Sequence, residues 1–156
     1  MNNFRLKNCI EKIIDYRGKT PTKMGGDWVD DGIRVVSAKN VHNGMFTDED
    51  SIRCVNEDVY KNWMKEPIKR GDCFLASEGA TLGESLYWDS DERIVLGQRL
   101  YAIRTNPNVL DAKFFAQYMQ TDTYRKEIVA NSTGSTVFGI SQPGLLNTRL
   151  TIPDID

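Results

Sequence analysis

Loops that combine glycine with hydroxyl or amide side chains separate the short strands and helices predicted by this sequence. The most distinctive of them runs from Gly134 to Ser141, between a long helical segment and a short last strand. Glycine permits positive φ angles and close approach of the backbone, and serine and threonine can both donate and accept hydrogen bonds. Val137, Phe138 and Ile140 are expected to anchor this loop to a core. Such a loop suits the recognition of a ligand, and it equally suits an ordinary connection between a helix and a strand.

The length and the bulk properties of the chain predict one globular domain. Its 156 residues are enough for a core of their own. No run approaches the ~20 apolar residues that a membrane span needs, and the first residues contain no apolar segment typical of a secretory signal. Cys9, Cys54 and Cys73 are widely spaced, which favours reduced thiols over a zinc site. We therefore expect a cytoplasmic protein without a metal site and without a membrane partner.

Charge is segregated along the chain although the net charge is only −2. Net charges of +4 over residues 1–24 and +3 over 61–70 alternate with −5 over 25–60 and −5 over 71–96, and residues 97–110 carry +2. A net charge near zero argues against a non-specific DNA-coating protein. Alternating blocks can fold into one basic and one acidic face, and they can also form an ordinary solvated surface.

Hydrophobic periodicity and turn signals predict mostly short elements in the first half of the chain. Residues 4–16 have near-helical spacing and predict a short helix that runs into a strand. A strand is expected over 33–37, followed by a tight turn at Asn43-Gly44. Asn56 is suited to cap a short helix, and residues 73–76 predict a buried strand.

The second half predicts two more strands, a helical region and a closing strand. Strands are expected near 84–88 and 93–104, the latter interrupted by Gly97-Gln98-Arg99. The chain from 110 to 130 is predicted to be helical and divided near Thr121, and Ser141 is suited to cap a further helical turn before a strand at 149–152 that Pro153 ends. The helical region carries an apolar stripe that we expect to face the core, made of Phe114, Phe115, Tyr118, Met119, Ile128 and Val129.

The sequence contains no recognisable catalytic constellation. The Gly18-Lys19-Thr20 triplet resembles the end of a phosphate-binding loop, but that motif needs an earlier glycine where Ile13 stands and a helix where Pro21 follows. The acidic run 48–50 could hold Mg²⁺ only together with further ligands, and a solvated loop is its simpler interpretation. We therefore predict no catalytic residue and no metal ligand.

A different pattern recurs, in which a polar side chain able to reach a base edge lies beside a glycine or at a turn. Arginine and lysine suit guanine, asparagine and glutamine suit adenine, and serine and threonine can contact either bases or phosphates. The repetition of this pattern favours DNA binding more than any single instance does. Its instances are Lys39-Asn40, Ser77-Glu78-Gly79, Gly97-Gln98-Arg99 and Gly134-Ser135-Thr136.

In their order, these motifs resemble a target recognition domain of the specificity (S) subunit of type I restriction–modification systems. The resemblance covers about residues 4–153. The matching segments are Gly18-Lys19-Thr20-Pro21, 33–41 with Gly44, 68–72 with Ser77 and Gly79, Gly97-Gln98-Arg99, 134–137 with Gly139-Ile140, and Ile152-Pro153.

The resemblance implies a mixed α/β, α+β-like fold: one recognition domain over residues 1–153 with a twisted mixed β-sheet, packed helices and projecting DNA-reading loops. It implies that the chain reads one half of a bipartite double-stranded DNA target and catalyses nothing itself. The implied partners are modification subunits, the restriction subunit through the complex, and a second recognition domain or a second copy. Those partner subunits, and not this chain, would bind S-adenosylmethionine, Mg²⁺ and ATP. Residues 154–156 fall where the conserved spacer helix of the family would begin, and without that helix docking on the modification subunit is in doubt.

Ten residues are candidates for DNA binding. Lys39, Asn40, Gln98 and Arg99 are candidates for base or near-base contacts, although each could instead shape the domain or grip the DNA backbone. Candidates for phosphate contacts or for loop positioning are Lys19, Thr20, Lys23, Ser77, Ser135 and Thr136. Two alternatives remain open: a recognition region of a fused restriction–methylation enzyme, and a protein-interaction module that uses the acidic segment 46–58.

Overall fold

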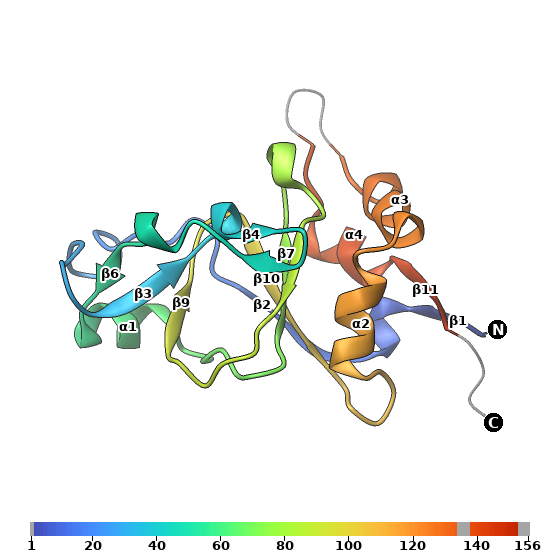
Figure 1. Ribbon diagram of the computed structural model, residues 1–156, viewed down its shortest axis with the longest axis horizontal. Coiled ribbons are helices and arrows are strands. Elements are labelled where there is room, and N and C mark those ends of the chain that lie inside the picture. Colours follow the sequence, from blue (N-terminus) through green and yellow to red (C-terminus); the bar gives the residue numbers. More distant parts are fainter. Residues whose placement is uncertain (1, 134–137, 153–156) are drawn as a thin grey trace.

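A four-stranded antiparallel sheet runs through the middle of the molecule (Figure 1). The computed structural model describes residues 2–133 and 138–152. The order of the sheet is β2-β10-β7-β8, and its pairings are antiparallel throughout. The bounds of these strands are Ile10–Asp15 for β2, Leu100–Thr105 for β10, Cys73–Ala76 for β7 and Ser85–Tyr87 for β8.

The two faces of this central sheet contribute to two separate hydrophobic cores, because successive side chains of a strand point to opposite faces. Phe74 and Ala102 belong to one core, whereas Leu75 and Ile103 belong to the other. Strand β7 is consequently buried at all its positions, which is why its sequence is a continuous apolar run instead of an alternating one.

The first core is closed by a smaller sheet and one helix. This sheet has the order β6-β3-β9, in which β3 pairs antiparallel with β6 and parallel with β9. The helix α1 begins after Asn56, whose side chain accepts a hydrogen bond of 3.0 Å from the Val59 backbone and so confirms the predicted cap. The elements are β3 (Ile33–Val36), β6 (Cys54–Val55), β9 (Ile94–Leu96), α1 (Glu57–Trp63), and the hairpin β4 (Val41–His42) and β5 (Met45–Phe46).

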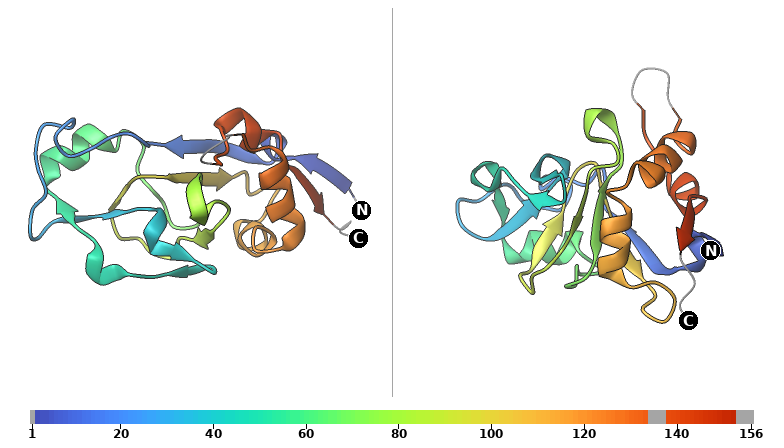
Figure 2. Two further views of the ribbon diagram at one scale, coloured as in Figure 1. Left: turned by 90° about the horizontal axis from the view of Figure 1, so that it is seen from above. Right: turned by 45° about the vertical axis from the view of Figure 1, so that its right-hand side comes forward.

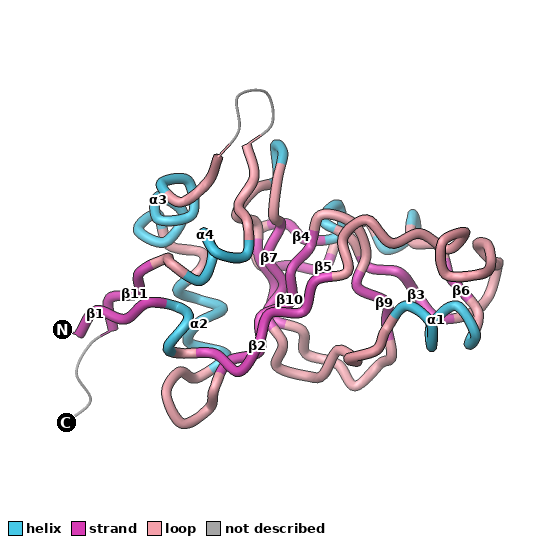
Figure 3. The backbone as a smooth tube through the Cα atoms, turned by 180° about the vertical axis from the view of Figure 1, so that it is seen from behind, coloured by secondary structure: helices cyan, strands magenta, loops and turns pink. Residues whose placement is uncertain are grey.

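The second core lies on the other face, under three helices and a two-stranded ribbon. Figure 3 shows these elements on the side of the central sheet opposite to α1. The two ends of the chain meet in the ribbon, where Asn2 pairs with Ile152 (Figure 2). The elements are α2 (Ala112–Tyr118), α3 (Asp122–Ala130), α4 (Gln142–Leu146), β1 (Asn2–Arg5) and β11 (Arg149–Ile152).

The mixed α/β class predicted from the sequence is confirmed, with the strands divided among four sheets in place of one. The short helix expected within residues 4–16 is wrong. A 3-10 turn, Leu6–Asn8, connects strands β1 and β2 there. The helical spacing of the apolar residues gave a wrong prediction because Leu6 and Ile14 are buried in different cores. The pairing of β1 with β11 and of β2 with β10 fixes the backbone of both strands as extended.

The helical region divides at Thr121 as predicted, since the Thr121 hydroxyl caps α3. The expected apolar stripe is only partly buried. Phe115 on α2 and Met119 at its C-terminal cap are buried one turn apart, whereas Phe114 lies beside them and is 38% exposed. Val129 is 56% exposed at the end of α3, because the break at Thr121 prevents one face from continuing through both helices.

The loop from Gly134 to Ser141 is described only from Phe138 onward. Ile140 anchors it as expected: its side chain is buried, and its carbonyl accepts a 2.7 Å hydrogen bond from the Tyr101 hydroxyl. Phe138 is 53% exposed, so its expected anchoring role is wrong. Val137, with Ser135, Thr136 and Pro153, lies outside the described residues. No helix in the described segments has the length and apolar character needed to cross a membrane.

Candidate nucleic-acid interface

A three-residue turn, Gly97–Arg99, carries the chain from β9 to β10 and bonds to the loops on both sides of it. The Gly97 backbone donates to the Val36 carbonyl at 2.7 Å, and the Gln98 carbonyl accepts from Ala38 at 3.1 Å. The Arg99 carbonyl accepts from the Ser77 backbone at 2.9 Å. Loops 37–40 and 77–79 therefore meet at this turn. A side chain at position 97 would stand 2.8 Å from the Val36 carbonyl, so this close approach requires glycine.

The Gln98 side chain adds the loop 17–23 to the same junction. Its Oε1 accepts from the Gly18 backbone at 3.1 Å, and its Nε2 donates to the Lys19 carbonyl at 2.5 Å. The segment 138–140 joins from another side, because Gly79 donates to the Phe138 carbonyl at 2.8 Å. We call residues 17–23, 37–40, 77–79 and 97–99 the junction loops. Eight of the ten candidate residues lie on these loops, and the structure brings the loops together.

Several basic side chains on and beside the junction loops have no carboxylate partner among the described residues, although Arg17 does pair with Asp15 and Glu78. Lys19 donates to the Trp63 carbonyl and Lys23 to the Gly18 carbonyl, whereas Lys39 and Arg99 are exposed and have no side-chain hydrogen bond or ion pair to any described residue. Arg53, 4.0 Å above the Trp28 ring, has no carboxylate partner in the described chain either. We call this set the uncommitted cations: Lys19, Lys23, Lys39, Arg53 and Arg99.

Some arginines elsewhere on the molecule pair with carboxylates instead. Arg34 pairs with Glu49 and Glu92, and Arg70 pairs with Asp89 and Asp91. Because cations without carboxylate partners are free to contact phosphates, the junction loops have the electrostatics of a nucleic-acid interface, which the net charge of −2 conceals.

The structure corrects the prediction that Asn40 contacts a base, because the Asn40 side chain does not reach the surface. Its side chain is fully buried. Its Oδ1 accepts from the Ser37 backbone at 3.0 Å, and its Nδ2 donates to the carbonyls of Thr47 and Asp48 at 3.0 and 3.2 Å. All of these bonds hold the loop that presents the exposed Lys39. Ser77 is buried as well, and its contacts with Arg17 and Ile140 position the junction loops.

Replacing Asn40 by alanine is expected to lower the free energy of unfolding by about 1–3 kcal/mol, because three backbone groups lose the hydrogen bonds that the buried amide makes with them. The measurement is urea unfolding followed by fluorescence. Lys39→Ala, one residue away and exposed, is the matched control and should leave stability nearly unchanged. Equal stability of the Asn40→Ala variant and the unmodified chain would contradict this structural role.

Arg17, Asp15 and Gln142 form a cluster that the sequence analysis did not single out. Arg17 lies 4.3 Å above the Tyr101 ring and binds both carboxylate oxygens of Asp15, at 2.9 and 3.1 Å. Gln142 donates to Asp15 at 3.0 Å. Burial opposes ionisation of Asp15, but the hydrogen bonds from Arg17 and Gln142 outweigh it and hold the pKa of the carboxyl below its ordinary value. This cluster ties the carboxyl end of β2 to α4 and places Arg17 beside Ser77.

Asp15→Asn should therefore destabilise the protein in a pH-dependent way. A carboxyl whose pKa is depressed by folding stabilises the native state above its unfolded pKa of about 3.9, and that stabilisation is lost as pH falls through the folded pKa. The difference in unfolding free energy between the unmodified chain and Asp15→Asn should be largest near pH 7 and shrink below about pH 4. Urea titrations from pH 3 to 7 measure it. Glu11→Gln, on the exposed side of the same strand, is the control, and a difference that grows at low pH would contradict the prediction.

The described part of the chain has no cluster of side chains suited to a metal, and Cys9 and Cys73 are buried thiols. No group of three or more His, Cys, Asp or Glu side chains there could hold a metal ion. Burial raises the pKa of the Cys73 thiol to about 12, with the charge of Asp72 adding to the effect, and burial also raises the pKa of Cys9. Both thiols are therefore protonated and unreactive at neutral pH.

Four of the candidate residues, Lys19, Thr20, Lys39 and Gln98, line one pocket of about 500 Å³. Arg99 lies outside this pocket, close to Gly79 on the neighbouring loop. Lys23 is exposed and donates to Gly18 within its own loop. Ser135 and Thr136 lie outside the described residues. The candidate interface thus has a pocket lined by residues of loops 17–23, 37–40 and 97–99, and an exposed arginine beside the loop 77–79.

No protein-family model and no curated protein matches the sequence. Solved structures do match the fold. The S subunit of a type I restriction–modification system from M. genitalium is similar over 95% of this chain and 33% of its own, with a TM-score of 0.59 and 13% identity. A structure that describes assembly and conformational transition of a type I R-M system is similar over 96% and 33%, with a TM-score of 0.60 and 16% identity.

The HsdS subunit from Thermoanaerobacter tengcongensis is similar over 97% of this chain and 37% of its own, with a TM-score of 0.62 and 12% identity. The chain therefore has the fold of one part of these proteins and spans about a third of the length of each.

Proposed function

We propose that this chain is a sequence-specific reader of double-stranded DNA and that the junction loops contact the DNA. The observation that carries the proposal is that nearly the whole chain shares the fold of a part of type I specificity subunits. The uncommitted cations support it independently, since phosphate contacts supply most of the affinity for DNA and base contacts supply the choice of sequence. Lys39, Gln98 and Arg99 are the exposed candidates for base or near-base contacts.

In this proposal the chain reads one half of a bipartite target and has no catalytic role. Modification subunits would methylate the DNA, and a restriction subunit would cleave it. Those subunits would bind S-adenosylmethionine, Mg²⁺ and ATP in the cytoplasm. Residues 1–153 would form the recognition domain, and a second recognition domain or a second copy of the chain would read the other half. Asn2 and Ile152 lie side by side, which suits a domain joined at one end to a spacer.

The two alternative functions would use different parts of the protein surface. A recognition region of a fused restriction–methylation enzyme would use the same junction loops, and the genes next to this one distinguish it from a separate subunit. A protein-interaction module using the acidic segment 46–58 is less well supported. Glu49 in that segment already pairs with Arg34 at 2.9 Å, and so does not offer its charge freely to a partner.

Selection from a pool of randomised duplexes tests the proposal. The chain should enrich one short sequence at moderate salt, with modest affinity because a small module makes few contacts. The affinity should fall linearly on logarithmic axes as salt rises. If no sequence is enriched by this chain, alone or with a spacer helix added at each end, the proposal is wrong.

A further inference from the structure

The pocket beside the junction turn is larger than three other hollows of the described structure, and it differs from those three in charge. Its volume is about 500 Å³, against 280 to 400 Å³ for the others. The charged residues described along its wall are Lys19, Lys39 and Arg53, and no acidic residue is among them. Each of the other three hollows includes at least one carboxylate. On a chain whose net charge is −2, this pocket selects for an anionic ligand.

The walls of the pocket are largely apolar, which a site for a bare phosphate does not need. Trp28 lies on one side, and Arg53 is stacked on its ring at 4.0 Å. Pro21, Val35, Ile52 and the buried Trp63 also line the pocket. A flat ring system can pack against such walls and against a stacked guanidinium, since every nucleobase has a π-face.

Polar groups lie on the remaining sides of the pocket. The hydroxyls of Thr20, Thr22 and Ser37 can donate to phosphate oxygens, and Lys39 has no side-chain hydrogen bond or ion pair to any described residue. Gly97 leaves bare backbone on the wall between β3 and the junction turn. A volume of about 500 Å³ lies within the usual range for small-ligand sites, about 300–1,000 Å³.

We propose that this pocket binds one nucleotide, with the base against Trp28 and the apolar walls and the phosphate at Lys19 and Lys39. The ligand class is a nucleoside monophosphate group. It can come from a bound DNA strand, as a nucleotide unstacked from the duplex, or from free mononucleotide. The DNA source rests on the proposed function, whereas binding of a free nucleotide does not. Unstacking a nucleotide costs a few kcal/mol, which contacts inside the pocket would offset.

Indole resonances give a direct test, because the chain has three tryptophans and two of them, Trp28 and Trp63, line the pocket. Deoxynucleoside monophosphates added to the ¹⁵N-labelled chain should shift the Trp28 and Trp63 signals, while Trp88, which does not line it, should stay in place. The deoxynucleosides and inorganic phosphate, each added alone, should bind at least several-fold more weakly. Shifts at Trp88 alone, or no shift with any nucleotide up to tens of millimolar, would overturn the proposal.

Substitutions of pocket residues test whether the nucleotide that causes these shifts is bound in the pocket. Arg53→Ala and Lys39→Ala change exposed side chains and should each raise the dissociation constant of the nucleotide about fivefold or more. Arg70→Ala, whose exposed partners Asp89 and Asp91 lie elsewhere, is the matched control and should have no effect. Unchanged affinity in both pocket variants would place the nucleotide elsewhere and contradict the assignment.

A duplex of the selected sequence, carrying 2-aminopurine at one position at a time, separates the two sources. If the nucleotide comes from DNA, the fluorescence of 2-aminopurine at one position should rise on binding, and Arg53→Ala should remove that rise. If the fluorescence rises at no position while mononucleotides still shift the Trp28 signal, the pocket takes free nucleotide. Selective duplex binding without any shift of Trp28 or Trp63 would refute the pocket and leave the proposed function standing. Nucleotide binding at the pocket without selection of any duplex would refute the proposed function and leave the pocket standing.

Discussion

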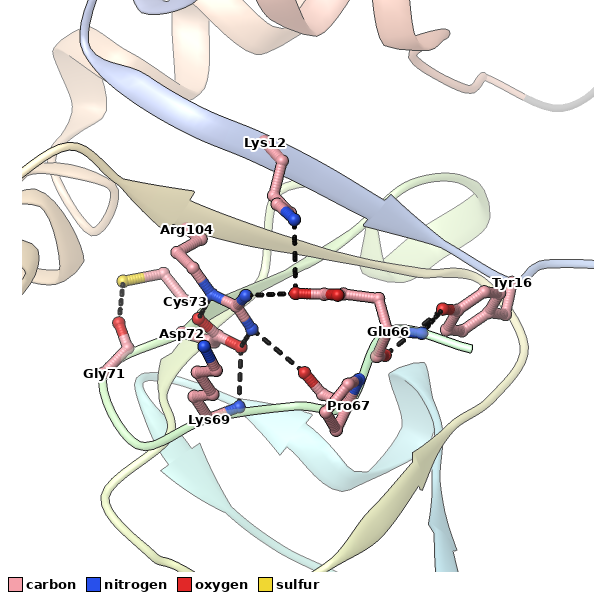
Figure 4. Close-up of polar contacts among 9 residues, drawn as sticks. All are labelled: Lys12, Tyr16, Glu66, Pro67, Lys69, Gly71, Asp72, Cys73 and Arg104. Carbon is pink, nitrogen blue, oxygen red and sulfur yellow. Dashed lines mark hydrogen bonds and ion pairs between the residues drawn. The ribbon is translucent and has the colours of Figure 1, made fainter. Parts of the chain in front are cut away.

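Arg104→Ala is expected to lower the free energy of unfolding by about 3–5 kcal/mol, because it leaves a buried carboxylate without its charged partner. Figure 4 shows the network. Arg104 binds both oxygens of Asp72, with Nε to Oδ1 at 2.9 Å and Nη2 to Oδ2 at 2.8 Å. The side chains of Arg104 and Asp72 are only 11% and 2% exposed. After the substitution, the Lys69 backbone would be the remaining described hydrogen-bond donor to the Asp72 carboxylate.

The Arg104 network also joins two strands of the central sheet, β10 and β2, to the segment 66–72. Arg104 on β10 binds Glu66 at 2.5 Å and the Pro67 carbonyl at 3.0 Å, and Lys12 on β2 reaches the same Glu66 oxygen at 3.2 Å. Hydrogen bonds from Arg104 and then Lys12 lower the pKa of Glu66. Removal of Arg104 therefore also removes its contacts with Glu66 and Pro67, in the segment 66–72 that leads into the buried strand β7.

Urea unfolding of four proteins separates these effects: the unmodified chain, Arg104→Ala, Arg104→Ala with Asp72→Asn, and Arg70→Ala. The double variant should recover part of the loss, because the uncompensated charge is gone. Arg70→Ala removes an equally elaborate but exposed pair and should change stability far less. A loss in Arg104→Ala no larger than that in Arg70→Ala would contradict the account.

Arg99→Gly is expected to weaken specific DNA binding about tenfold or more while leaving the fold at least as stable. Arg99 has a φ of +61°, a left-handed conformation that costs an L-residue roughly 1–2 kcal/mol and costs glycine nothing comparable. Its guanidinium is exposed and has no partner in the described chain. An exposed arginine with a positive φ and no partner contributes nothing to the stability of the fold, and this favours a role in binding.

Two substitutions at position 99 distinguish the backbone effect from the side-chain effect. Arg99→Ala keeps the unfavourable φ and loses the guanidinium, whereas Arg99→Gly removes both. Asn43→Gly is the matched control, since Asn43 also has a positive φ, +50°, but belongs to the β4–β5 turn. Both Arg99 variants should bind DNA equally poorly, with the glycine variant the more stable in thermal unfolding, and Asn43→Gly should bind normally. Normal binding by Arg99→Gly would exclude Arg99 from the interface.

The selected sequence would further define the contact. Loss of preference at a single base pair in Arg99→Ala means direct readout, about 1–3 kcal/mol at that position. A uniform loss on all sequences with a shallower salt dependence means a phosphate contact. A lower thermal midpoint with unchanged binding would mean that Arg99 is structural.

Local sequence signals predicted the loops well, because turns and caps depend on residues close together in the chain. The Gly97–Arg99 break between two strands, the Asn43-Gly44 turn and the Asn56 cap all lie where the residues indicated. The division of the helical region at Thr121 is a further instance.

The parts of the site that depend on the three-dimensional fold could not be predicted in this way. Arg53 and Trp28 are 25 positions apart, and the bridge of Val29 to Cys54 brings them together. Lys39 and Asn40 are adjacent and form one motif in the sequence. The three-residue turn nevertheless directs the Asn40 amide back into its own loop, while Lys39 is exposed. The spacing within residues 4–16 indicated a helix because one apolar pattern supplies two different cores.

The most direct test of the central claim is an exchange of recognition units. Residues 2–152 would replace one recognition region of a type I specificity subunit, and methylome sequencing of cells carrying the hybrid system would report its modified sites. We predict a bipartite site in which one half is new, matches the sequence selected by the isolated chain and is altered in the Arg99→Ala hybrid, while the other half is unchanged. An assembled hybrid complex that methylates only through the unchanged half, with no preference at the other position, would contradict the account.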